Sequence, residues 1–333
     1  MDNARETVKK AVRFQSPERI PLLFATSLEK SDIVNIPVVR HFIGEGGRFS
    51  EWGFEWENLN GDLAMGQPKN QVITDYDMLK NYCPPKADDA ARFQKTKEMM
   101  AQYGADKYYK ANFNLSGFAI MTMLRGFSQV MEDFYIEREA LESLCDMVFD
   151  FECEVIKLLP SYGFDAVGFA DDWGTQNSLF IPPELWREVF KPRYAKQYAL
   201  AHSLGLDVYL HSCGYIFDII PDLIEIGLDI LNPGQPDING VERMGKAFGG
   251  KICFSCPVSY QTTAISGSKD DIRAQIVSYI NCLGCFNGGL IGIIPEDSAA
   301  LGISDESFQY MEMTFKEMFH SVNNNIRRCK IEL

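Results

Sequence analysis

The chain has 333 residues, of which 46% are hydrophobic and 23% are charged, and this composition is typical of a globular protein with a large core. The formal net charge of −14 argues against a nucleic-acid-binding surface, which needs a basic face, and leaves few cations for a polyanionic substrate. The sequence shows no signal-peptide core near its N-terminus and no apolar run as long as a membrane span, so we expect a cytoplasmic protein without membrane contact. The nine cysteines are then expected to be reduced thiols.

The first part of the chain mixes predicted helices, strands and loops. An amphipathic helix over 2–14 ends before Pro17, and a strand follows over 19–24. Ser31 is a candidate N-cap for a helix that runs toward Phe42 with an interruption near Pro37. The next predicted elements are a loop over 44–48, a polar helix over 87–103, a strand over 107–113 and a helical stretch over 116–134 that breaks at Gly126.

From residue 137 onward, strands and helices alternate regularly. Helices are predicted over 137–162, 182–204, 216–226, 240–248, 270–283 and 304–319, and strands over 165–170, 208–210, 229–231, 251–254 and 289–294. Short apolar strands between helices predict parallel βαβ units, and the pattern alone leaves a closed barrel and an open sheet as alternatives. Phe169, Leu210, Ile230 and Ile252 are expected to be buried.

Polar residues follow the predicted strands at one common place. Asp171, His211, Gln235, Cys256 and Glu296 each come just past the C-terminal end of a strand. Active sites of parallel α/β folds lie at these ends, in barrels especially. One such residue means little, but five on successive strands predict a functional mouth.

The segment His211-Ser212-Cys213-Gly214 follows the apolar strand over 208–210. Residues two apart in an extended chain project to the same face, so His211 and Cys213 are expected to point to one side. A neutral imidazole and a thiolate there could share one metal ion, and such ligands favour zinc with a position left open for chemistry. The alternative is a core histidine beside a buried cysteine, because H-x-C is a short pattern.

Two Cys-x-x-Cys pairs together imitate a zinc site. Cys253 lies inside a predicted strand, so Cys253 and Cys256 should face opposite sides, and Cys282 of the second pair with Cys285 lies in a predicted helix. Zinc knuckles need tight turns, so we expect neither pair to bind metal.

Two other groups of residues each allow two interpretations. The segment that contains Trp52 and Trp56 could line a cavity or cover one end of a core. Asp171 and Asp172 are adjacent at a strand end, where neighbouring side chains diverge. Only one of the two is therefore expected to face the centre, and the other to cap a loop.

Several stretches of the chain resemble members of the uroporphyrinogen decarboxylase superfamily, which also contains methyltransferases that work with methylcobamides and thiols. In the family's order, these stretches are EWGFEW at 51–56, LRGF at 124–127, DDWGTQ at 171–176, PPELWR at 182–187 with KP at 191–192, HSCG at 211–214, LNPGQ at 231–235 and QTT at 261–263. They span nearly the whole chain. The resemblance implies one domain over 1–333, a (β/α)8 TIM barrel with an N-terminal helical extension.

The resemblance distinguishes two branches of the family. Its decarboxylases carry an arginine-rich N-terminal segment that grips substrate carboxylates, whereas residues 21–49 here offer only Arg40 and Arg48. The methyltransferase branch instead binds zinc through His-x-Cys after one strand, which His211 and Cys213 match.

The third zinc ligand of the methyltransferase branch is a cysteine after the last strand. Aligning Gly288-Gly289-Leu290 on that strand puts Glu296 near the expected cysteine, with Asp297 beside it. A carboxylate is an acceptable zinc ligand, so the resemblance implies Glu296 as third ligand. Cys256, from a nearer strand, is the alternative.

The resemblance also implies a reaction. Zinc would assist the transfer of a methyl group between a small thiol or methoxy substrate and a methylcorrinoid, which a separate corrinoid protein carries to the mouth. A homodimer is a candidate assembly. The implied catalytic residues are Asp171 and His211, and the implied substrate-binding residues are Trp52, Trp56, Asp172, Trp173, Gln176 and Gln235.

Two other functions remain open at the level of sequence. The first is a metal-free decarboxylase of uroporphyrinogen or a related aromatic acid, in which Asp171 or Asp172 stabilises a protonated ring and His211 is a polar wall. The second is a non-catalytic barrel that acts as a binding subunit. Metal content separates the first from the methyltransferase.

Overall fold

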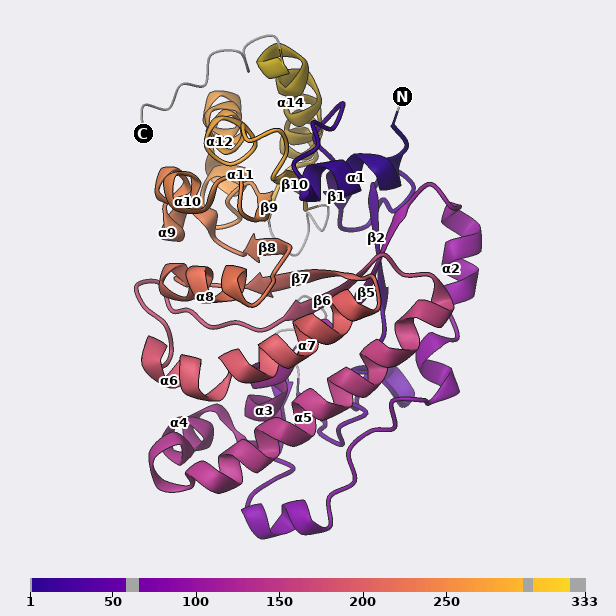
Figure 1. The fold of residues 1–333 in the computed structure, drawn as a ribbon, viewed down its shortest axis with the longest axis vertical. Helices are drawn as coiled ribbons and strands as arrows, with labels where there is room; N and C mark the ends of the chain where they lie inside the picture. The colour runs from indigo at the N-terminus through magenta and orange to yellow at the C-terminus, as the bar shows by residue number, and fades with distance from the viewer. Residues whose placement is uncertain (1, 58–65, 296–301, 324–333) are drawn as a thin grey trace.

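The computed structural model describes residues 2–57, 66–295 and 302–323. Eight parallel strands form one sheet that curls into a nearly closed barrel with helices around it (Figure 1), so the fold is the predicted (β/α)8 TIM barrel. In sheet order, the strands are β1 (Leu22–Phe24), β10 (Leu290–Ile294), β9 (Cys253–Pro257), β8 (Ile230–Pro233), β7 (Asp207–Ser212), β6 (Ala166–Ala170), β5 (Tyr108–Asn112) and β2 (Ile33–Pro37). A short antiparallel pair, β3 (Trp56–Glu57) and β4 (Gln67–Pro68), lies outside the barrel sheet.

Helices cover the outside of the barrel. They are α2 (Thr96–Tyr103), α3 (Gly117–Arg125), α4 (Phe127–Ile136), α5 (Arg138–Leu158), α6 (Pro183–Val189), α7 (Lys191–Ser203), α8 (Ile220–Glu225), α9 (Pro236–Asn239), α10 (Val241–Phe248), α11 (Thr263–Ser266), α12 (Lys269–Cys282) and α14 (Asp305–Asn323), with α1 (Ala4–Val12) at one end. The pair α5 and α7 lies on one flank of the strands and the pair α12 and α14 on the opposite flank (Figure 1).

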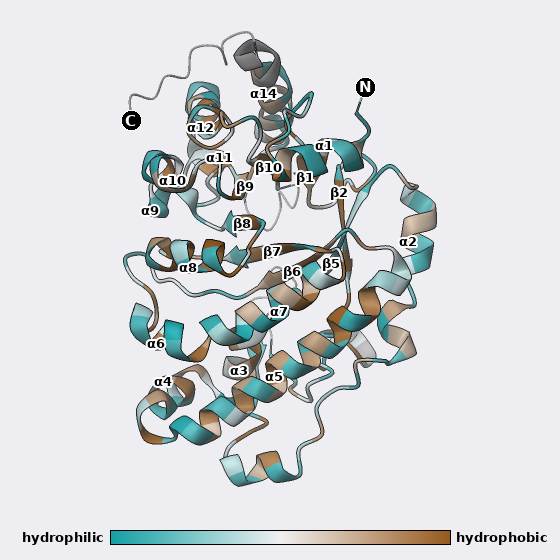
Figure 2. Cartoon of the chain, in the orientation of Figure 1, coloured by the Kyte–Doolittle hydropathy of each residue, from teal (hydrophilic) through white to brown (hydrophobic). Residues whose placement is uncertain are grey.

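The barrel strands bury both of their faces, which is why they are mainly apolar rather than strictly alternating with polar residues. Figure 2 shows hydrophobic strands at the centre and hydrophilic outer faces on the helices. One set of side chains, including Tyr209 and Ile230, fills the barrel, and the other, including Phe169 and Leu210, packs against the helices. The predicted burial of Phe169, Leu210, Ile230 and Ile252 is confirmed, because none of the four is more than 1% exposed.

Helix α1 closes the N-terminal end of the barrel. Val8 and Val12 from this helix join the cluster of side chains inside the barrel. At its C-terminal end, Ala11 accepts a hydrogen bond from the backbone N–H of Gly289, which immediately precedes β10. The opposite end, where the strands have their carboxyl termini, is the mouth.

Strands β1 and β2 meet at a seam that differs from every other strand contact. They share no β-ladder in the described structure, and two side chains and one backbone hydrogen bond bridge them. The backbone N–H of Leu22 donates to Asp32 Oδ2 at 2.8 Å, and that of Phe24 donates to Ser31 Oγ at 3.0 Å. The Asp32 N–H also donates to the Leu22 carbonyl at 2.8 Å.

The predicted helix from Ser31 toward Phe42 is wrong, because this stretch forms β2. Ser31 uses its hydroxyl at the seam with β1 rather than as a helix N-cap. Pro37 stands at the last position of the strand, where a missing backbone N–H is tolerated.

Other predicted elements needed smaller corrections. The single helix over 182–204 is two helices, α6 and α7, which meet at Phe190 just before Pro192. The helix over 87–103 is a 3-10 turn (Ala90–Phe93) followed by α2. Among the helices in the described ranges, none has the length and apolar character needed to cross a membrane.

Candidate functional site

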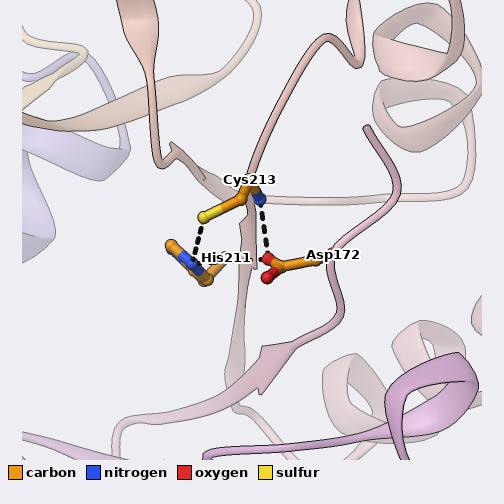
Figure 3. Close-up of side chains that lie close together, drawn as sticks. All are labelled: Asp172, His211 and Cys213. Atoms are coloured by element: carbon orange, nitrogen blue, oxygen red, sulfur yellow. Dashed lines mark hydrogen bonds and ion pairs between the residues drawn. The ribbon is translucent and has the colours of Figure 1, made fainter. Parts of the chain in front are cut away.

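The strand β7 carries the central residues of the site. It continues two residues beyond the apolar run to Ser212, so His211 is still part of the strand and faces inward. Cys213 follows on the same side, with its Sγ 3.3 Å from His211 Nε2 (Figure 3), as the alternation of strand side chains predicted. The chain then turns at Gly214, whose φ is +79° and where a Cβ would overlap the carbonyl of Gly174.

Asp172 completes this cluster from the neighbouring strand. Its Oδ1 accepts a hydrogen bond of 2.7 Å from the Cys213 backbone N–H and lies 3.6 Å from His211 Nε2 (Figure 3). One ligand atom from each of Asp172, His211 and Cys213 lies within 4.8 Å of the other two. Within the described part of the chain, this is the one group of three such side chains that could hold a metal ion.

Asn232 on β8 determines which nitrogen of His211 faces the cluster. The Asn232 Nδ2 donates to the Ser255 carbonyl at 2.6 Å, which leaves its Oδ1 to face His211 Nδ1 at 2.5 Å. Because an amide oxygen only accepts hydrogen bonds, His211 must carry its proton on Nδ1 and donate it. The lone pair of Nε2 then points toward Cys213 and Asp172, which is the usual arrangement of a histidine metal ligand.

The donor set fits zinc. Imidazole nitrogen, thiolate sulfur and carboxylate oxygen are its usual ligands, and three protein ligands leave a fourth position open. Burial, with Asp172 nearby, raises the pKa of the Cys213 thiol to about 12, so without a cation this sulfur keeps its proton at neutral pH. A divalent metal ion would replace that proton, because metal binding requires the thiolate.

Asp171 lies away from the mouth, on the outward face of its strand. It is fully buried, and its carboxylate accepts hydrogen bonds from the N–H groups of Phe118 and Ala119 at 2.9 and 2.8 Å and from the Tyr194 hydroxyl. Burial raises the pKa of Asp171 well above its ordinary value. One aspartate of the pair faces the centre and the other caps a neighbouring segment, as expected, but the inward one is Asp172.

The three tryptophans expected at the substrate lie in the protein core. Trp52 packs edge-on against Phe151, with ring centroids 4.9 Å apart, and Trp173 stacks on Phe118 at 4.4 Å. Trp56 lies nearer the mouth, where it stacks on Phe42 at 5.3 Å. For Trp52 and Trp56, the structure supports the second interpretation, an aromatic cluster that covers a core.

The two glutamines expected to bind substrate lie at the edge of the site. Gln176 is exposed on the loop after β6. Gln235 accepts a hydrogen bond of 2.5 Å from the Gly214 backbone N–H through its Oε1. Gln235 therefore holds the turn that follows Cys213.

The remaining candidate ligands take different positions. Cys253 faces the barrel interior and Cys256 the surrounding helices, so the two do face opposite sides as predicted. Cys256 thus belongs to the outer core and lies outside the cluster around His211. Glu296, the third ligand that the resemblance implied, and Asp297 lie outside the described residues.

A cavity of about 490 Å³ opens at the mouth beside the cluster. Its lining residues are Leu23, Asn35, Phe42, Lys110, Asn112, Asn114, Phe169, Ala170, Tyr209, His211, Asn232, Tyr260 and Ile293. Lys110 and Asn232, which both line this cavity, were not among the residues predicted for the site. A charged residue in the middle of the strand sequence YYKAN, and an asparagine at the end of β8, were the available signals.

The fold and the site together define an α/β barrel with polar side chains gathered at the carboxyl ends of its strands, which is the arrangement of barrel enzymes. The model of the family described as Uroporphyrinogen decarboxylase (URO-D) matches residues 69–282, more than half of the chain. The chain therefore belongs to the uroporphyrinogen decarboxylase family. A search of curated proteins finds no match.

Solved structures are similar to this chain mainly in fold. A methyltransferase from Methanosarcina mazei is 14% identical and has a TM-score of 0.74, with 96% of this chain and 100% of that one covered. A D-psicose 3-epimerase from Clostridium cellulolyticum H10 is 10% identical, with a TM-score of 0.45 and coverage of 91% and 99%. The GH18 chitinase ChiB of Flavobacterium johnsoniae is 11% identical, with a TM-score of 0.43 and coverage of 90% and 95%.

Proposed function

We propose that this protein is a zinc-dependent methyltransferase that moves a methyl group between a small thiol or methoxy substrate and a methylcorrinoid carried by a separate protein. The observation that carries the proposal is the convergence of His211, Cys213 and Asp172, with Asn232 directing the lone pair of His211 toward the other two. Family membership supports it, since this family contains methyltransferases of that kind. The fold shared with the Methanosarcina mazei methyltransferase is consistent with it.

In this proposal, His211, Cys213 and Asp172 hold the zinc. Cys213 supplies the thiolate, His211 supplies Nε2, and Asp172 supplies a carboxylate oxygen from the end of β6. Glu296 stays a prediction as a further or alternative carboxylate ligand. Once bound, zinc lowers the pKa of a substrate thiol or polarises an ether oxygen as a Lewis acid.

The residues around the cluster orient the reaction and limit water. Asn232 keeps the Nδ1 proton of His211 engaged, so this histidine acts as a ligand rather than as a proton donor toward the substrate. Tyr260 and Ile293 line the inner wall of the cavity, and Phe42, which is 54% exposed, stands at its rim. Transfer from the methylcorrinoid to a substrate thiolate would form the S–CH3 bond and break the Co–CH3 bond, whose electron pair would stay with cobalt.

The alternative decarboxylase function is less well supported. The two arginines available in the segment 21–49 are already paired with carboxylates of this chain. Arg40 lies 2.5 Å from Asp89, and Arg48 is paired with Glu55. Among the described residues that line the mouth cavity, Lys110 is the only lysine or arginine, which is a poor match for a substrate with many carboxylates.

Metal analysis after dialysis tests the proposal. Wild-type protein should contain stoichiometric zinc and should transfer methyl groups from methylcobalamin to small thiols. Cys213→Ala and His211→Ala should lose most of the metal, whereas Cys83→Ala, at an exposed cysteine, should keep it. Comparison of Asp172→Ala with Glu296→Ala decides which carboxylate binds. Full zinc retention in Cys213→Ala, or methyl transfer by a metal-free wild type, would refute the methyltransferase and favour the decarboxylase.

A further inference from the structure

A buried cation lies in the mouth cavity below the metal cluster. Lys110, on β5, is only 4% exposed, and its Nζ lies 3.4 Å from the centroid of the Tyr209 ring. Its ammonium group forms no hydrogen bond or ion pair with any residue that the structure describes. An aromatic face recovers part of the desolvation cost of a buried cation but supplies no hydrogen-bond acceptor.

The surrounding strands hold this ammonium group in place. Lys110 extends from β5 across the neighbouring strand, where Gly168 leaves room for it. A Cβ at Gly168 would lie 2.8 Å from Lys110 Cδ and 3.0 Å from Cε, so any larger residue would displace the lysine. On the other side, Asn35 is the register partner of Lys110, and its buried Oδ1 also lacks a hydrogen-bond partner. The Asn35 oxygen and the Lys110 ammonium group thus face one cavity, and neither has a hydrogen-bond partner among the described residues.

The other buried charged side chains of the described structure have hydrogen-bond or ion-pair partners. Arg92 forms two hydrogen bonds with Glu51, at 2.8 and 2.6 Å, and Asp165 is paired with Arg5 at 2.7 Å. An unpaired buried charge is costly and is retained where a ligand supplies the partner. Lys110 is such an exception, and it faces the cavity rather than a neighbouring helix.

The distance to the metal cluster limits the size of that ligand. Tyr209, which lies beneath the ammonium group, precedes His211 by two residues on the same face of β7. Two residues along a strand span about 6.6 Å. A molecule that touches both Lys110 and the cluster therefore needs only a short chain between its two ends. Leu23 and Ile293 offer apolar contacts to that chain.

We propose that Lys110 binds the acid group of the substrate, so that the substrate is a short carboxylic acid whose thiol or methoxy group reaches the cluster of Asp172, His211 and Cys213. For the reacting end of the substrate, this inference rests on the proposed function. For the acid end of the substrate, it rests on Lys110 alone. One cation selects a substrate with one acid group. The carboxylate accepts charge-assisted hydrogen bonds from Nζ, and an amide flip at Asn35 adds an N–H donor.

The test compares an acid with its neutral analogue. We would measure by calorimetry the dissociation constants of 3-mercaptopropanoate and 3-mercaptopropanamide for wild type, for Lys110→Met and for the control Lys196→Met. Lys196 is an exposed lysine paired with Asp150 on the outer surface. Wild type and the control should bind the acid about tenfold more tightly than the amide, as expected of a hydrogen-bonded ion pair in a buried site. Lys110→Met should lose this preference while it keeps its affinity for the amide.

The outcome separates this inference from the proposed function. An equal affinity of wild type for acid and amide, absence of acid binding at millimolar concentration, or an unchanged preference in Lys110→Met would overturn it. In Cys213→Ala, the preference for the acid should persist although methyl transfer is lost. If wild type lacks zinc but still prefers the acid through Lys110, the acid site stands and the proposed reaction fails.

Discussion

The two ends of the barrel differ in whether their charged side chains have partners within the fold. At the N-terminal end, Arg13, the C-cap of α1, is paired with Asp207 and lies 3.0 Å from Asp229. Asp207 also accepts a hydrogen bond of 2.6 Å from the Tyr108 hydroxyl. Asp165 is paired with Arg5 and Lys9 at 2.7 and 3.0 Å. The strand-end carboxylates at this end therefore find their partners within the fold.

At the mouth, the polar groups are grouped but not neutralised. Cys213, His211 and Asp172 place three electron-rich atoms together, and Lys110 lies below them without a carboxylate partner among the described residues. The comparison indicates that the charges at the N-terminal end stabilise the fold, whereas the polar groups at the mouth contribute less to stability and are the ones that the proposed function uses. This division agrees with the general roles of the two faces of such barrels.

The largest expected effect on stability comes from a core residue between the two ends, so it should not distinguish one end from the other. Leu210→Ala removes a fully buried side chain from the outer face of β7. The cavity should lower the free energy of unfolding by about 2–5 kcal/mol, as measured by urea denaturation. A loss below about 1 kcal/mol would show that this packing was misjudged.

A change at the N-terminal end should affect stability alone. Asp207→Ala leaves Arg13 and the buried Tyr108 hydroxyl without their shared partner. The free energy of unfolding should fall by about 2–4 kcal/mol. This range is lower than that expected for a fully buried ion pair, because Arg13 is partly exposed. The zinc content of the folded protein should not change. Zinc loss without loss of stability would contradict the division between the two ends.

A change at the mouth should raise the free energy of unfolding instead of lowering it. Burial lowers the pKa of Lys110 to about 7 from 10.5. The unfolded chain therefore binds this proton more tightly than the folded one. As a result, the free energy of unfolding of the wild type rises between about pH 7 and pH 10.5. Lys110→Met removes the group and should be more stable than wild type by about 2–4 kcal/mol at pH 7. The gain should shrink toward pH 10.5 in urea denaturation curves. A variant less stable than wild type at pH 7 would show that the ammonium group has an internal partner.

The smallest expected effect concerns the orientation of His211. Asn232→Leu removes the acceptor of the Nδ1 proton and should weaken zinc binding about 10- to 100-fold in a chelator competition. Asn232→Asp keeps an acceptor at this position and should retain more of the affinity. Equal zinc affinities in the two variants would mean that the hydrogen bond at His211 Nδ1 does not control how this histidine binds zinc.

Much of the site could be predicted from the sequence because β-strand geometry is local. The spacing of His211 and Cys213 was enough to place them on one face. The choice between Asp171 and Asp172 failed for a physical reason. Both faces of β6 are buried, and the inward residues Ala166, Gly168 and Ala170 are small, so hydrophobicity did not show which face was inside. Counting in twos from Gly168 leads to Asp172.

The remaining errors depend on partners that are distant in sequence. The contact of Asn232 with His211 arises because β7 and β8 pair in the register that sets these two residues opposite each other. That register is not encoded in either strand alone. Ser31 is a good helix N-cap, so the sequence predicts a helix where the structure has β2. The role of Ser31 at the seam appears only when β1 lies beside it.

The seam between β1 and β2 has a consequence for local opening. Elsewhere, a ladder of backbone hydrogen bonds holds each strand to its neighbours. Here a single backbone bond, from Asp32 to the Leu22 carbonyl, crosses the seam, and the amides of Leu22 and Phe24 donate to the side chains of Asp32 and Ser31. Rotation of two side chains is enough to release them, whereas other strand amides require the separation of two strands. Hydrogen–deuterium exchange should therefore begin at this seam, which makes β1–β2 the place where the barrel opens before it unfolds.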